Sequence, residues 1–407
     1  MPIVDMPLEK LKAYQGRNPR PADFDEFWDK SLAELRAIDP APVFEKHDLP
    51  AAHAECYDLT FTATKGAKIH CNFVRPKEID GKVPAVLTFH GLSGEGSPFS
   101  HLMRWVEEGY CAVSMDSRGQ GGESEDVGGV AGTTFTTPFT RGLDGEPEGL
   151  LVRDLFLDTA MLARVVMDLP YVDETRVGCY GGSQGGGLSV ACAALVPEIK
   201  LCAPTYPYMS DYKRVWEMDL ATGAYEGIKY YFRHFDPRHE REEEIFTKLG
   251  YIDIQNLAPR IKAKVLMSTG LMDKTCPAST QFAAYNKMTC EKSMDIYPDF
   301  GHEGMLDWII GGHYNPAPRI QKLVVENKIQ AYNWPQGVIS VMFRDIAANR
   351  PTVSRIGLHT FVDPRLEGGR LNSVTTEQIV KPITIDGDEF LLYKHPEHLD
   401  FALLRGT

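Results

Sequence analysis

A serine surrounded by glycines is the first group in the sequence that could do chemistry. Ser183 lies in the stretch GCYGGSQGGGLSV, which fits the pattern G-x-S-x-G through Gly181, Ser183 and Gly185. Two interpretations compete: a flexible turn that contains a serine, and a tight strand-to-helix turn that lifts the hydroxyl clear of a sheet. An apolar run precedes the stretch and the helical run GLSVACAALV follows the elbow. This context favours the second interpretation, in which Ser183 is a nucleophile.

A serine hydroxyl is a weak nucleophile until a nearby base takes its proton, and that base needs an orienting carboxylate. Both groups occur downstream. Asp273 ends an apolar run in STGLMDKTCP, and His302 lies in the turn YPDFGHEG after the next run. Asp299 is a rival orienter, but it shares a short turn with His302 and is less able to reach behind the imidazole. The order Ser183, Asp273, His302 is that of α/β-hydrolases, and it predicts a catalytic triad.

An acyl-transfer site also needs fixed N–H donors for the oxyanion. One donor is the amide after the nucleophile, here that of Gln184, and the second comes from a loop after an early strand. The loop HGLSGEGS predicts the Leu92 amide as this second donor. His90, in the same loop, could instead be a packing residue beneath it. Other histidines, such as His234 and His239 in RHFDPRHERE, are predicted to lie on a solvated, charged face.

The candidate residues follow apolar runs that read as strands buried on both faces of a parallel sheet, because they lack polar alternation. Six such runs are KVPAVLTFHG, GYCAVSMDSRG, RVGCYGGS, IKLCAPTYP, AKVLMSTGLMD and SMDIYPDFGHE. Residues 151–169 have apolar side chains at helical spacing. This alternation predicts an α/β fold with a mostly parallel sheet and helices on both faces. Ligands bind beyond the carboxyl ends of such strands, so the triad would meet at one rim. The turn-rich residues 128–149 are predicted to form a long loop near it.

The composition is that of a globular protein and argues against several classes of partner. The 407 residues are 43% hydrophobic and 24% charged, and the chain is long enough for two or three domains or for one large domain with an appendage. The net charge of -13 argues against nucleic acid and anionic lipid. We expect no membrane helix, because no apolar run approaches about 18 residues. The start MPIVDMPLEKLKAYQG does not resemble a secretory signal. Eight scattered cysteines predict buried free thiols in a cytoplasmic protein rather than disulfides or a zinc site.

Further motifs accompany the candidate triad along about the first three quarters of the chain. They are the N-terminal segment MPLEKLKAYQGRNPRPADFDEFWDKSLAEL, an R-G-Q motif at Arg118, Gly119 and Gln120 in DSRGQGG, and the strings GGSQGGGLS, GLMDKTCPASTQFAAYN and GHEG, the last of which holds His302 and Glu303. In this combination residues 1–304 resemble the cephalosporin-C deacetylase and acetyl xylan esterase group, carbohydrate esterase family seven.

The resemblance implies an α/β-hydrolase domain that removes acetyl groups from small substrates, including short xylo-oligosaccharides and cephalosporin C. It also implies a cytoplasmic, ring-shaped hexamer whose active sites face a central cavity that excludes polymeric xylan. Arg118 and Gln120 carry over as supporting residues rather than catalytic ones. An exposed loop pair is the alternative interpretation of these two residues.

The resemblance changes after His302, where the esterase group would finish with one helix packed on the sheet. Residues 305–407 contain no cysteine, and two strings resemble an internal piece of the N-terminal half of acetate or propionate coenzyme A-transferases: IIGGHYNPAPRIQKLVVENKIQAYNWPQGVISVMFRDIAANRP and RIGLHTFVDPRLEGGRLN. The catalytic glutamate of that family lies in its C-terminal half, so the resemblance implies a partial α/β segment without transferase chemistry. We expect Met305, Leu306, Trp308 and Ile309 to replace the missing helix, and SRIGLHTFV to form a strand with an open edge.

The sequence therefore predicts a serine esterase that works through an acetyl-enzyme and needs no metal or organic cofactor. His302 would act as the base toward Ser183. Two alternatives from other classes stay open. One is a fusion protein related to coenzyme A-transferases, which would use a glutamyl nucleophile, and the other is a hydrolase-like binding protein without turnover.

Overall fold

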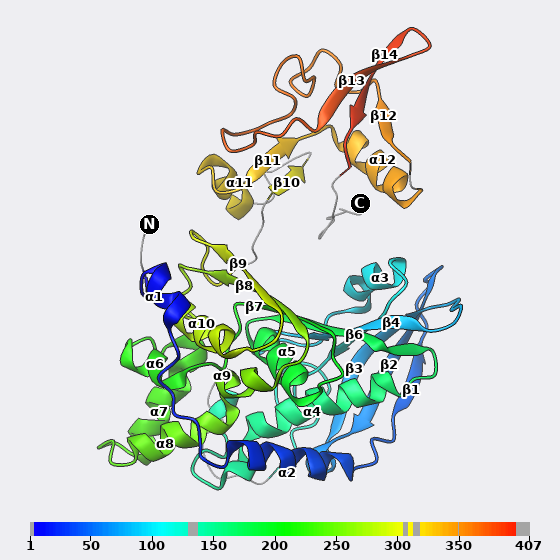
Figure 1. Cartoon of the computed structure of the whole chain (residues 1–407). Coiled ribbons are helices and arrows are strands. Elements are labelled where there is room, and N and C mark those ends of the chain that lie inside the picture. Colours follow the sequence, from blue (N-terminus) through cyan, green and yellow to red (C-terminus); the bar gives the residue numbers. More distant parts are fainter. Residues whose placement is uncertain (1–3, 129–136, 304–307, 312–317, 349, 396–407) are drawn as a thin grey trace. The chain divides into compact units, whose positions relative to one another are not determined.

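The computed structural model describes residues 4–128, 137–303, 308–311, 318–348 and 350–395 (Figure 1). The chain divides into two compact units, residues 1–303 and 304–407, and each contains a hydrophobic core of its own. Within the described ranges, no helix combines the length and the apolar character needed to cross a membrane.

The described part of the first unit is built on a nine-stranded sheet with the order β1-β2-β3-β5-β4-β6-β7-β8-β9 (Figure 1). The pairs β1–β2, β2–β3 and β3–β5 are antiparallel, and every pair from β5 through β4 to β9 is parallel. The strands are β1 (Val43–His47), β2 (Ala54–Thr62), β3 (Lys68–Pro76), β4 (Val83–Phe89), β5 (Cys111–Met115), β6 (Val172–Gly182), β7 (Leu201–Thr205), β8 (Lys264–Gly270) and β9 (Lys292–Tyr297).

All six strands predicted from apolar runs are present, as β4 to β9. The expected burial on both faces is wrong for β8 and β9, where more and less exposed positions alternate and Leu266 is 46% exposed. The antiparallel strands β1 to β3 lie outside that prediction, because none of their sequences is a continuous apolar run. In β2, for example, buried positions such as Leu59 and Phe61 alternate with partly exposed ones. A continuous apolar run marks a strand that is covered on both faces, whereas an antiparallel strand with one solvated face lacks such a run.

Helices cover both faces of this sheet (Figure 1). On one face, Leu102 and Val106 of α3 (Phe99–Glu107) pack against β2, β3, β4 and β5. The opposite face carries α4 (Leu151–Met167) and α5 (Gln184–Leu195), and every residue of α5 is buried. A helix that is apolar all round belongs in such a position. The other helices of this unit are α1 (Leu8–Ala13), α2 (Phe24–Arg36), α6 (Tyr212–Glu217), α7 (Glu226–Phe235), α8 (Glu242–Leu249), α9 (Ile254–Leu257) and α10 (Ala278–Lys287).

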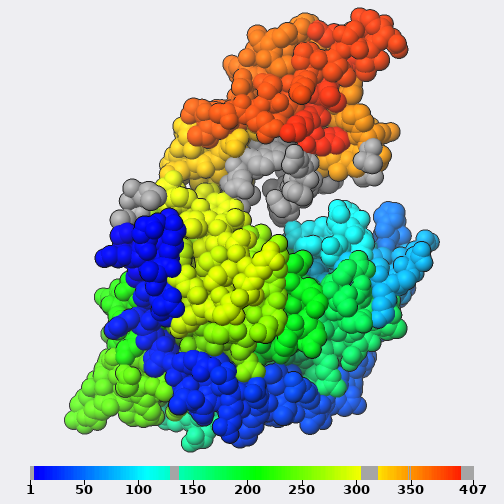
Figure 2. All heavy atoms as spheres, viewed as in Figure 1, coloured from blue at the N-terminus to red at the C-terminus, as the bar shows by residue number. Residues whose placement is uncertain are grey.

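The N-terminal residues, blue in Figure 2, lie along the outside of the first unit. Polar contacts hold them there at several points. The Asn286 side-chain amide donates to the carbonyls of Leu11 at 2.9 Å and Tyr14 at 2.7 Å. Further along, the buried Trp28 indole donates to the Tyr251 carbonyl at 3.0 Å. This segment therefore belongs to the folded unit rather than to a separate arm.

All eight cysteines are free thiols, as the sequence predicts. Seven are buried and Cys290 is partly buried. They serve as small apolar side chains of the core.

In the second unit, β10 (Trp308–Gly311) pairs in parallel with β11 (Gln330–Asn333), and α11 (Pro318–Val325) lies between them in sequence. Helix α12 (Gln336–Ala347) is followed by a sheet with the order β12-β14-β13. Its strands are β12 (Thr352–Ser354), β13 (Val380–Ile385) and β14 (Asp388–Tyr393). The core of this unit contains Tyr332, Trp334, Val338, Met342, Val362, Ile379, Val380, Leu391 and Tyr393.

Two expectations for the C-terminal part are wrong. Trp308 and Ile309 form strand β10 rather than a replacement helix, because they pair with β11 of the second unit; residues 305 and 306 lie outside the described residues. Residues 355–362 form turns rather than a strand. Gly357 and His359 have φ angles of +100° and +59°, which a strand cannot contain. The predicted loop at 128–149 is partly outside the described residues, and its described part contains turns and two short 3-10 helices.

Candidate active site

Ser183 lies at a sharp turn between strand β6 and helix α5. Its φ is +58°, a left-handed value that non-glycine residues rarely adopt. Two glycines allow this turn to pass close to the end of β4. A Cβ on Gly181 would lie 2.6 Å from the Phe89 carbonyl oxygen, and a Cβ on Gly185 would lie only 2.0 Å from it. The G-x-S-x-G stretch is therefore a tight strand–turn–helix elbow and not a flexible turn.

His302 joins Ser183 to Asp273 by two hydrogen bonds. Its Nε2 is 2.9 Å from Ser183 Oγ, and its Nδ1 is 2.8 Å from Asp273 Oδ2. Asp273 is fully buried, and its Oδ1 accepts the amides of Thr275 and Cys276, both at 2.8 Å. A carboxylate held in this way accepts the Nδ1 proton and leaves Nε2 as the acceptor for the serine hydroxyl. The orienting contact comes from Asp273, which the sequence favours over Asp299.

Tyr206, which belongs to none of the sequence motifs, packs beside His302. The two ring centroids are 4.5 Å apart, with 52° between the ring planes. Burial and the negative charge of Asp273 raise the pKa of the Tyr206 phenol, which therefore keeps its proton. His302 is 22% exposed, so one side of the imidazole still reaches solvent. One feature of the sequence could have identified Tyr206 as a site residue: it directly follows β7, which ends at the same rim of the sheet as the strand before Ser183.

The two predicted oxyanion donors belong to segments that Gln120 connects. The side-chain amides of Gln120 and Gln184 donate to each other at 2.9 and 3.0 Å. Gln120 Oε1 also accepts the backbone amide of Ser93, next to Leu92, at 2.8 Å. Within the described residues, the backbone amides of Leu92 and Gln184 donate to no protein group. Both amides therefore remain available to a substrate oxygen.

His90 supports the loop that carries Leu92. Its Nε2 accepts the Ser117 amide at 2.9 Å, and its Nδ1 is 2.7 Å from the Gly91 carbonyl oxygen, so the proton is on Nδ1. Burial lowers the pKa of His90, which keeps the ring neutral. Of the roles considered for His90, the structure shows packing support beneath the loop.

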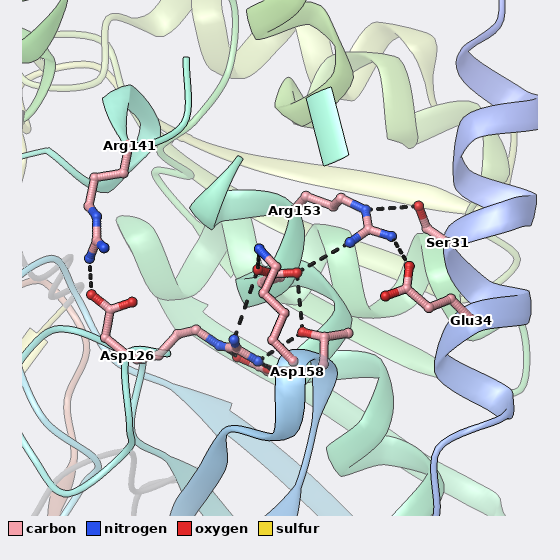
Figure 3. A network of polar contacts seen from close by, with 10 residues as sticks. Ser31, Glu34, Asp126, Arg141, Arg153 and Asp158 are labelled. Carbon is pink, nitrogen blue, oxygen red and sulfur yellow. Dashed lines mark hydrogen bonds and ion pairs between the residues drawn. The ribbon is translucent and has the colours of Figure 1, made fainter. Parts of the chain in front are cut away.

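Arg118 is buried, and its partner Asp158 is labelled in the network of polar contacts that Figure 3 shows. Its guanidinium donates to both carboxylate oxygens of Asp158 on α4, and to Thr64 Oγ1 at 3.0 Å. The side chains of Arg118 and Asp158 are both 0% exposed. The interpretation of Arg118 as part of an exposed loop pair is therefore wrong. Arg118 anchors the start of the loop on which Gln120 lies.

The network continues from α4 to α2 (Figure 3). Asp154 lies one helical turn before Asp158, and its Oδ1 accepts a hydrogen bond from Nη1 of the adjacent Arg153 at 3.3 Å. Arg153 donates to Ser31 Oγ at 3.0 Å and to the carboxylate of Glu34. These contacts connect α2 to α4 and, through Asp158, to Arg118 of the R-G-Q loop.

The remaining residues singled out from the sequence lie at the surface. Gly119 is exposed with a φ of +69°, which suits its turn. Glu303 is exposed, and its carboxylate accepts the Gly301 amide at 3.3 Å. His234 and His239 are exposed, as predicted.

Comparison with known proteins connects this site to esterases. Residues 1–314 match the model of the family described as acetyl xylan esterase (AXE1). The crystal structure of acetyl xylan esterase 1 from Thermoanaerobacterium sp. JW/SL YS485 is 54% identical, has a TM-score of 0.73, and covers 74% of this chain and 95% of its own. An acetyl xylan esterase from Paenibacillus sp. R4 is 33% identical, with a TM-score of 0.71 and coverage of 79% of this chain and 99% of its own.

Among curated proteins, the acetyl esterase Axe7A of Xylanibacter ruminicola is 28% identical over 300 residues, which are 71% of this chain and 64% of that protein. A separate segment matches the acetate CoA-transferase YdiF of Escherichia coli (strain K12), with 46% identity over 106 residues, which are 26% of this chain. The chain spans only 20% of the length of that transferase.

Proposed function

The chain belongs to the acetyl xylan esterase family, and from that premise we propose that its first unit is a serine esterase that deacetylates small substrates. One observation carries the proposal. His302 lies 2.9 Å from Ser183 Oγ and 2.8 Å from the buried carboxylate of Asp273. This arrangement supports removal of the serine proton while the oxygen attacks a carbonyl carbon.

In the proposed reaction, His302 takes the proton of Ser183 as Oγ forms a bond to the acetyl carbon. The amides of Gln184 and Leu92 hold the oxyanion that develops. When the ester bond breaks, the alcohol leaves with the proton from His302, and an acetyl-serine remains. Water then repeats the sequence and releases acetate. Asp273 keeps the Nδ1 proton in place and stabilises the imidazolium form of His302 in both halves. These steps use no metal or organic cofactor.

We propose acetyl esters of small alcohols as the substrates, with acetylated xylo-oligosaccharides and cephalosporin C among them. The names of the similar proteins support the acetyl group: two are acetyl xylan esterases and one is an acetyl esterase. Nitrophenyl esters of increasing chain length test this point. We expect the acetyl ester to have the highest kcat/KM, and equal values for the acetyl and octanoyl esters would rule out acetyl specificity.

A cytoplasmic hexamer is part of the same proposal, supported by family membership. Sedimentation of the full chain tests it, and a monomer would contradict it. The match to a coenzyme A-transferase spans only a fifth of the length of that enzyme, and no transferase activity is part of the proposal.

Hydrolysis of p-nitrophenyl acetate by the full chain tests the proposed activity. We expect a serine-directed phosphonate to abolish it, and Ser183→Ala to lower kcat by a factor on the order of 10⁶. Circular dichroism should show a folded variant, since Ser183 is partly exposed and its loss opens no core cavity. A coenzyme A-transferase would instead form a glutamyl thioester, and a binding protein would show no turnover. If the purified Ser183→Ala protein kept more than about one hundredth of the activity, Ser183 would not be the nucleophile.

A further inference from the structure

A cavity of about 340 Å³ opens beside α6 and α7 of the first unit. Its lining includes Trp216, Asp219, Thr222, Lys229, Phe232 and Arg233, and none of the proposed triad or oxyanion residues. The volume lies at the lower end of the range for small-molecule sites, about 300–1,000 Å³. The cavity is thus large enough for a ligand of modest size.

Three rings form one wall of this cavity. Phe232 and His239 are stacked, with centroids 4.5 Å apart and planes at 10°. Trp216 packs against both, at 5.1 Å from Phe232 and 5.4 Å from His239. Trp216 is only partly buried, and in the described part of the chain its indole N–H has no hydrogen-bond partner. An apolar ring face with a donor at its edge suits a ligand that has both C–H surfaces and hydroxyl groups.

Two cations and one carboxylate, that of Asp219, line the same cavity. Lys229 and Arg233 are four residues apart on α7, and neither forms an ion pair with any described residue. Like charges at this spacing weaken a helix slightly. Arg233 in the last turn is favourable to the helix dipole, but Lys229 in the first half of α7 is not. The two cations together outnumber the single carboxylate of the lining, so the cavity can accept an anionic group.

The remaining polar lining residues suggest what kind of anion fits. Asp219 and Thr222 are exposed and supply a carboxylate and a hydroxyl, which suit the hydroxyl groups of a sugar. The negative charge of Asp219 disfavours a doubly charged phosphate and is better matched by a ligand with one negative charge. His239 is paired through Nδ1 with Glu242 at 3.3 Å, so it adds little to the positive charge of the cavity.

We propose that this cavity binds a carboxylated pyranose, that is, a uronic acid unit of an oligosaccharide. Lys229 and Arg233 hold the carboxylate by charge-assisted hydrogen bonds. The sugar ring lies against Trp216, and Asp219 and Thr222 bind its hydroxyl groups. The site takes no part in ester hydrolysis and does not depend on the proposed esterase activity.

Calorimetric titration of the full chain with glucuronic acid at pH 7 tests this site. We expect glucuronic acid to bind at least tenfold more tightly than glucose, because glucose lacks the carboxylate. The double variant Lys229→Ala/Arg233→Ala should lose at least tenfold in affinity for glucuronic acid. A matched control, Lys200→Ala/Lys262→Ala, removes two exposed cations that do not line the cavity and should change affinity less than twofold. Hydrolysis of p-nitrophenyl acetate should be the same in all three proteins, which shows that they are folded.

Several outcomes would overturn the proposal. They are the absence of glucuronic acid binding, equal affinities for glucuronic acid and glucose, and tighter binding of glucose 6-phosphate than of glucuronic acid. Equal losses in the two double variants would show a general charge effect instead of a site. An unchanged affinity in Lys229→Ala/Arg233→Ala would place the bound sugar elsewhere, including in the proposed active site.

Discussion

Replacing Arg118 by methionine should destabilise the first unit by about 3–5 kcal/mol, the usual cost of leaving one partner of a buried ion pair alone. Arg118 gives two hydrogen bonds to Asp158 and one to Thr64, and both charged side chains are 0% exposed. Methionine fills part of the space but leaves Asp158 without a cation. Burial already raises the pKa of Asp158 above its ordinary 3.8 in spite of Arg118, and without Arg118 the pKa would rise further. The cost should therefore be small below pH 3.8 and grow as the pH rises through the raised pKa.

Unfolding in urea measures this cost. The loss of p-nitrophenyl acetate hydrolysis serves as the signal, so that the unfolding of the first unit alone is observed. The double variant Arg118→Met/Asp158→Leu removes both charges and should regain about the 3–5 kcal/mol lost in Arg118→Met, because replacing a buried ion pair by apolar side chains is often neutral or stabilising. A loss below about 1 kcal/mol in Arg118→Met would refute the reasoning. Additive losses in the double variant would also refute it, because the two side chains would then act independently.

Three further predictions concern single residues. Asp273→Asn should lower kcat by about 10⁴, because asparagine favours the wrong imidazole tautomer, and Asp299→Asn should have a much smaller effect; a reversed order in the kinetics would make Asp299 the orienter. Gln120→Ala should lower kcat by about 10- to 100-fold with little change in KM, since the loops of both oxyanion donors lose their connection; an effect on KM alone would contradict this role. The hydrogen bond from His70 to Asp116 raises the pKa of His70 above 6.5, so its stabilisation is complete below pH 6.5 and is lost as the pH rises through the raised pKa. In urea unfolding, His70→Gln should therefore lose more stability relative to wild type at pH 6 than at pH 9, and a constant difference would exclude this linkage.

Much of the site could be predicted from the sequence because Ser183, Asp273 and His302 each follow a parallel strand that its apolar residues mark. Parallel strands bring their carboxyl ends to one rim, so local patterns were enough to bring the three residues together. The preference for Asp273 over Asp299 could also be predicted, because Asp299 shares a short turn with His302 and its carboxylate is less able to reach behind the imidazole.

Contacts between distant segments could not be predicted in this way. The burial of Arg118 depends on Asp158, 40 residues away on another element, and no local pattern marks that pair. The contact of Tyr206 with His302 depends equally on the way β7 and the histidine turn meet. In the second unit, the run RIGLHTFV has the composition of a strand, but left-handed residues at Gly357 and His359 make it a series of turns.

The most direct test of the central claim is to identify the residue that carries the acyl group. The full chain is treated with a serine-directed fluorophosphonate, digested, and analysed by mass spectrometry, with a His302→Ala variant treated in parallel. We predict one modified residue, Ser183, in the peptide that contains GGSQGGG. The extent of its modification should rise in step with the loss of p-nitrophenyl acetate hydrolysis. The His302→Ala variant should be labelled only slightly. Complete inactivation with the label on another residue, or equally fast labelling of Ser183 without His302, would contradict the proposed triad.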